Sequence, residues 1–144
     1  MNKFNLDEVY RIALEVRNWA EHLWFQNDGD PDLTGCCVIA ATKLMKDLQS
    51  AGYEVVMHIS EFHGYICIGK YVVDVTATQF NFEDVVVIKP KKFFVEHFNV
   101  NVRMAYALND GNYTVCRSVE DVFTHQRKNM WPLSQSAITY AKEM

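Results

Sequence analysis

Three residues of this chain have the types needed for nucleophilic attack on a carbonyl carbon. Cys37 opens a predicted helix, where free backbone N–H groups and the positive end of the helix dipole favour a thiolate. The thiolate is the reactive form of cysteine, and its partner base is usually a histidine. His63 and Asp74 follow on two predicted strands. We therefore take Cys37 as the candidate nucleophile, His63 as the base and Asp74 as the acid that orients His63.

The spacing between His63 and Asp74 predicts that the two side chains can meet. Gly69 and Lys70 form a pair typical of a two-residue type II′ hairpin, so residue 68 should pair with residue 71. Counting outward from this turn puts His63 and Asp74 on one face, as diagonal neighbours about 7–8 Å apart along the backbone. An aspartate can reach an imidazole nitrogen across that gap. A slip of one residue would put the two on opposite faces.

The elements that must position these residues follow from hydrophobic periodicity. Apolar residues at helical spacing predict a first helix over residues 5 to about 25, capped by Asn5, and a second over about 36–51 that Gly52 ends. The period then changes to 2, which predicts strands over residues 53–60, 63–68, 71–76, 85–88, 98–108 and 113–117. A turn is expected at 109–112, and helices at 118–128 and 134–143. The sum is an α+β domain with N-terminal helices packed on an antiparallel sheet.

Length and composition bound the class of protein. With 144 residues, 49% of them apolar and 22% charged, the chain suits one domain over residues 1–144. The net charge of −4 gives no electrostatic reason to expect nucleic acid as a partner. No stretch approaches a membrane span, and the N-terminus lacks a signal-peptide core, so we expect no membrane partner and a cytoplasmic location. Four cysteines in such a chain are expected to be free thiols.

The segment from Leu33 to Thr76 resembles the core of papain-like and transglutaminase-like cysteine enzymes. Those families place Cys at a helix start, His at the opening of a following strand and Asp at the end of the next strand. The matching steps here are Gly35-x-Cys37, His63-Gly64-Tyr65 and Asp74-Val75-Thr76. The resemblance covers residues 33–80, about a third of the chain. It implies a papain-like/transglutaminase-like fold and a catalytic triad.

The resemblance also implies a reaction. The thiolate attacks a peptide or carboxamide carbonyl and forms a thioester acyl-enzyme, with hydrolysis, deamidation or amine transfer as the outcome. Such an enzyme needs no cofactor, and its partner is a peptide or protein substrate. The Cys37 N–H could form half of an oxyanion hole, with Gln26 or Asn27 as the other donor. The substrate, the choice among the three outcomes and the oligomeric state stay open.

Other interpretations compete with this one. Cys36 is a rival nucleophile and His58 a rival base; we prefer Cys37 because it shares a helix face with Ala41 and Leu44. Zinc is disfavoured because no C-x-x-C or H-x-x-x-H spacing occurs, and the acidic loop 28–32 lacks the EF-hand pattern, so no metal is expected. The alternative function is a catalytically inactive domain that binds a peptide or protein through the same cleft. An accessory protein with its chemistry elsewhere is a third possibility.

Overall fold

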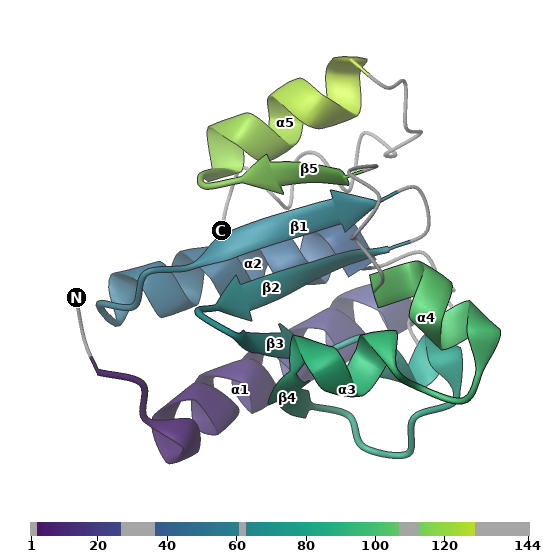
Figure 1. Cartoon of the computed structure of the whole chain (residues 1–144). Coiled ribbons are helices and arrows are strands. Elements are labelled where there is room, and N and C mark those ends of the chain that lie inside the picture. The colour runs from purple at the N-terminus through teal and green to yellow at the C-terminus, as the bar shows by residue number, and fades with distance from the viewer. Residues whose placement is uncertain (1–2, 27–36, 61–62, 107–112, 129–144) are drawn as a thin grey trace.

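The computed structural model describes residues 3–26, 37–60, 63–106 and 113–128. In this part of the chain a five-stranded antiparallel sheet has helices on both faces (Figure 1). The strands are β1 (Val56–Ser60), β2 (Gly64–Ile68), β3 (Tyr71–Asp74), β4 (Val87–Pro90) and β5 (Tyr113–Cys116), in the order β4-β3-β2-β1-β5. The predicted α+β class, with N-terminal helices on an antiparallel sheet, is confirmed.

Two hydrophobic clusters lie on opposite faces of the sheet. The first packs α1 (Leu6–Gln26) and α2 (Cys37–Ser50) against one face. The second packs α3 (Lys91–Val95) and α4 (Val100–Tyr106) against the other face. The remaining helices are a 3-10 turn, η1 (Ala77–Phe80), and α5 (Val119–Lys128), which follows β5. None of the helices that the structure describes has the length and apolar composition of a membrane span.

The ends of the first two helices form as the sequence predicts. Asn5 accepts a hydrogen bond on its side-chain oxygen from the N–H of Glu8, at 3.1 Å, and so caps α1. Gly52 follows α2 with φ +96°, and the N–H of Tyr53 reaches back to the carbonyl of Leu48 at 3.1 Å. This 6→1 bond is the mark of a Schellman ending, which needs a left-handed residue and so favours glycine.

The hairpin that positions the candidate site has the predicted register. Ile68 pairs with Tyr71, and Gly69 in the turn has φ +55°. Lys70 has no positive φ, as a type II′ turn requires of its second residue. Position 63 therefore falls on the same side of the sheet as Asp74.

The predicted strand over residues 98–108 is wrong. Residues 100–106 form α4, and α3 precedes it where the sequence suggested no helix. The apolar residues of this segment alternate along the chain, yet the buried ones, Val102, Ala105 and Tyr106, recur at helical spacing. Phe98, the first residue of the predicted strand, is 90% exposed.

One strand prediction is corrected in position: the strand expected over 85–88 is β4, displaced to residues 87–90. The strand expected over 113–117 is confirmed as β5, which pairs with β1. Helix α5 confirms the prediction for 118–128. The predicted turn at 109–112 and the predicted helix over 134–143 lie outside the described residues.

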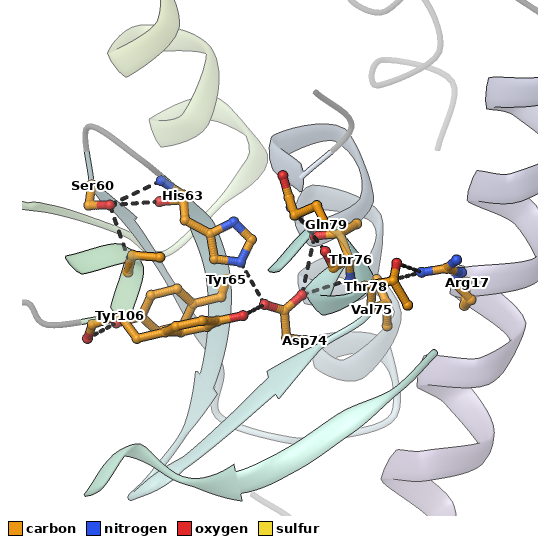
Figure 2. A network of polar contacts seen from close by, with 11 residues as sticks. Arg17, Ser60, His63, Tyr65, Asp74, Val75, Thr76, Thr78, Gln79 and Tyr106 are labelled. Atoms are coloured by element: carbon orange, nitrogen blue, oxygen red, sulfur yellow. Dashed lines mark hydrogen bonds and ion pairs between the residues drawn. The ribbon is translucent and has the colours of Figure 1, made fainter. Parts of the chain in front are cut away.

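A buried arginine fastens α1 to the segment that follows β3. Arg17 is 3% exposed and donates from Nη1 to the carbonyl of Val75 at 2.9 Å and to the hydroxyl of Thr78 at 3.0 Å (Figure 2). Its Nε also pairs with Glu21 at 2.8 Å. Because Val75 directly follows Asp74, this contact ties the first helix to the candidate site.

We expect Arg17→Met to lower the free energy of unfolding by about 2–4 kcal/mol, because it leaves a buried carbonyl and a carboxylate without their charged donor. Arg11→Met is the matched control, since Arg11 pairs with Glu15 four residues on but is 60% exposed. That change should cost less than about 0.5 kcal/mol. Urea unfolding at constant m-value measures both, and equal losses would contradict this role of Arg17.

Candidate active site

His63 and Asp74 form a buried ion pair at one end of the hairpin. His63 directly precedes β2 and Asp74 ends β3, and their side chains are 0% and 2% exposed. The Nε2 atom of His63 lies 2.6 Å from Oδ2 of Asp74 (Figure 2). The prediction that these two side chains reach each other is confirmed.

The carboxylate of Asp74 accepts hydrogen bonds from two further residues. The hydroxyl of Tyr106 donates to Oδ2, the same oxygen that His63 contacts. Thr76 donates to Oδ1 from its backbone N–H at 2.7 Å and from its hydroxyl at 3.2 Å. Burial raises the pKa of Asp74, but the charge and hydrogen bond of His63, together with the bonds from Tyr106 and Thr76, outweigh it and lower the pKa.

The imidazole of His63 is held in its charged form. Burial lowers the pKa of His63, but the negative charge and hydrogen bond of Asp74 oppose it, and the Cys37 thiol adds to them, so the pKa rises to about 10. The ring is also fixed in place by aromatic neighbours, Phe80 at 4.8 Å and Tyr106 at 5.0 Å between ring centroids. At neutral pH the site therefore contains an imidazolium beside a carboxylate.

Cys37 approaches this pair from the other face of the sheet. It is the first residue of α2, packs at the edge of the first cluster and is the one partly exposed member of the three. Gly64 permits the approach, because a Cβ at this position would lie only 3.3 Å from Cγ2 of Val38, the second residue of α2. The start of α2 therefore lies against the start of β2, next to His63.

The second ring nitrogen of His63 is the one left for Cys37. Nδ1 is buried and has no hydrogen-bond partner among the described residues. Cys37 raises the pKa of His63 through a side-chain hydrogen bond and through its charge, which indicates that its sulfur lies near the ring. The contact falls outside strict hydrogen-bond geometry.

The rival residues do not join this site. His58 lies on β1 with Nδ1 3.8 Å from the Sγ of Cys67, and burial raises the pKa of Cys67 to about 12. Cys116 is buried as well, with a pKa raised by burial to about 11. In the described part of the chain no group of three or more potential ligands could hold a metal ion. Cys36, Asn27 and the side chain of Gln26 lie outside the described residues.

Sequence reasoning missed the role of Tyr106. The sequence pattern predicts a strand at this residue. In the structure the residue lies on α4, and its hydroxyl donates to Asp74, which is 32 positions earlier in the chain. No local pattern signals a contact of this range. Thr76, in contrast, belongs to the Asp-x-Thr step, and its two bonds to Asp74 give that step a physical meaning.

We expect the His63 ring to stay protonated from neutral pH up to about 10, since the aspartate stabilises the imidazolium. Because the pKa of His63 is raised in the folded protein, the ion pair stabilises the fold fully at a pH below the ordinary histidine pKa. This contribution is lost as the pH passes about 10. In Asp74→Asn the pKa of His63 should fall, because burial is then opposed by Cys37 alone. Two-dimensional ¹⁵N spectra of the imidazoles measure both, with His63→Gln to assign the signal. Ordinary titration of wild-type His63 near its unperturbed value would contradict the ion pair.

Comparison with protein-family models, with curated proteins and with solved structures finds no match for this chain. The papain-like/transglutaminase-like relation therefore stays a resemblance of residues 33–80. What this protein does has to be inferred from the chemistry of Cys37, His63 and Asp74 themselves.

Proposed function

We propose that this protein is a cysteine-dependent hydrolase or acyltransferase that acts on amide bonds through Cys37, His63 and Asp74. One observation carries the proposal. A buried, fully hydrogen-bonded carboxylate holds His63 as an imidazolium by Nε2, while Nδ1 has no hydrogen-bond partner among the described residues and lies beside a partly exposed thiol at a helix start. An imidazolium and a helix N-terminus both stabilise a neighbouring thiolate.

In the first half of the proposed reaction, the Cys37 thiolate attacks the carbonyl carbon of the amide. A C–S bond forms and the carbonyl electron pair moves onto oxygen, where the backbone N–H of Cys37 can donate to it. His63 then gives its Nδ1 proton to the departing nitrogen, and the C–N bond breaks. A thioester on Cys37 and a neutral His63 remain, with Asp74 still holding Nε2.

In the second half, water or an amine attacks the thioester. Neutral His63 takes a proton from the attacking group, the C–S bond breaks and the thiolate returns. Water gives hydrolysis or deamidation, and an amine gives transfer. Cys37 is the partly exposed member of the three, so substrate meets its sulfur first, and the departing nitrogen must then come within hydrogen-bond reach of Nδ1 of His63.

A catalytically inactive binding domain is the second candidate function. The observation in its favour is the complete burial of His63, together with the lack of a strict hydrogen bond from its Nδ1 to Cys37. In that case the ion pair would serve to hold the hairpin and α4 together, and the thiol would have ordinary reactivity. The reactivity of Cys37 therefore separates the two functions.

We expect iodoacetamide to label Cys37 before the other cysteines, because this thiol is partly exposed and lies beside the imidazolium of His63. p-Nitrophenyl acetate should transfer one acetyl group to Cys37, seen as a burst of nitrophenolate and as a thioester-bound acetyl in the peptide mass spectrum. Cys37→Ala and His63→Ala should abolish the burst, about a hundredfold or more. Cys36→Ser is the matched control and should keep it. Uniformly slow labelling of all four cysteines would favour the binding domain.

Tyr106→Phe should slow acetylation about tenfold and move the acid limb of its pH profile to higher pH. Loss of a donor to the carboxylate raises the pKa of Asp74. When the pH is lowered, Asp74 of the variant is therefore protonated, and its ion pair with His63 is lost, at a higher pH than in the wild type. Tyr65→Phe is the control, since its hydroxyl donates to the Tyr106 carbonyl at 3.3 Å and does not touch Asp74. An unchanged acid limb in Tyr106→Phe would show that Tyr106 only packs.

A further inference from the structure

A pocket lies at the opposite end of β2 from His63. It has a volume of about 890 Å³ and is bordered by the hairpin turn, the start of α3 and the first residues of β1. It opens on the face that carries α3 and α4, since Val56 and Cys67 of its lining belong to the second cluster. This volume is typical of sites for small molecules.

The rim of this pocket is positively charged. Lys70 comes from the hairpin turn, Lys91 and Lys92 come from α3, and Glu54 is the one acidic residue of the lining. The N–H of Lys91 donates to the carbonyl of Lys70 at 3.1 Å, which fixes the two segments relative to each other. In the described residues neither Lys91 nor Lys92 forms an ion pair. A chain of net charge −4 thus concentrates unpaired cations at one pocket.

The floor of the pocket carries no charge. It consists of Val56 and the pair of Cys67 and His58, whose Sγ and Nδ1 atoms are 3.8 Å apart. Burial, and then the charges of Lys91 and Arg117, lower the pKa of His58, so it is neutral at pH 7. Lys91 also lowers the pKa of Cys67, against the larger effect of burial.

We infer that this pocket binds an amphipathic organic anion, with its apolar body on the floor and a carboxylate or phosphate group between the lysines. A bare inorganic anion would leave the apolar floor open to water, and an uncharged ligand would leave the cations without partners. The lysines supply the charge-assisted hydrogen bonds that recognise either anionic group. This site is separate from Cys37, His63 and Asp74 and does not depend on their chemistry.

The probe that tests this inference is 1-anilinonaphthalene-8-sulfonate, which joins an apolar body to an anionic group. Its addition should shift the amide signals of Val56, Cys67 and Gly69 in ¹H–¹⁵N spectra of the whole chain. The uncharged analogue N-phenyl-1-naphthylamine should bind about tenfold more weakly or worse. Shifts confined to the exposed apolar residues of α3 and α4, or equal binding of the two probes, would overturn the proposal.

Matched variants separate the pocket from the net charge of the protein. Lys91→Gln with Lys92→Gln should weaken binding of the sulfonate about tenfold or more. Lys3→Gln with Lys89→Gln removes the same charge outside this lining and should leave affinity unchanged. Unchanged spectra outside α3 show that the first variant is folded. Equal weakening by both pairs would overturn the proposal.

Displacement of the sulfonate identifies the anionic group. Octanoate and octyl phosphate carry linear apolar chains of similar length on different groups, and octanol lacks the charge. Displacement by either anion but not by octanol supports the proposal, and the better competitor names the group. Failure of both anions, or equal displacement by octanol, overturns it.

Discussion

The contact between Nε2 of His63 and Oδ2 of Asp74 is the constraint on which the arrangement of this half of the molecule depends. An ionised carboxylate that is 2% exposed is stable only when its oxygens are hydrogen-bonded. Here Oδ2 accepts from His63 and Tyr106, and Oδ1 from Thr76. The pair therefore requires the start of β2, the end of β3 and the end of α4 to meet at one point.

Stability alone does not account for such a pair. A buried ion pair loses hydration on both sides, and apolar residues of similar volume often stabilise a fold as well or better. His63 and Asp74 stand among aromatic rings that would accept an apolar replacement, Phe80 and Tyr106 among them. The retained charge makes sense if Nδ1 of His63, which has no partner in the part of the chain that the structure describes, acts on Cys37.

The sequence predicts the parts of this site that depend on local geometry. A two-residue turn at Gly69 fixes the hairpin register, and the register fixes which face Asp74 occupies. It could not predict α4, because apolar residues at alternate positions over 98–108 satisfy a strand pattern, and only the packing of Val102 and Tyr106 selects the helix. No sequence pattern could therefore predict that Tyr106 donates a hydrogen bond to the carboxylate of Asp74.

The chain contains its own comparison for the candidate site. Two Cys–His pairs lie near the same strand: Cys37 with His63 before its start, and Cys67 with His58 along it. Both imidazoles lose hydration on burial, yet the pKa of His63 rises to about 10 while that of His58 falls. The charged neighbours of His58 are the cations Lys91 and Arg117, which lower its pKa further. The difference is Asp74, which contacts His63 and not His58. The carboxylate is thus what keeps the His63 ring charged, whereas His58, which has cations as its charged neighbours, is neutral at pH 7.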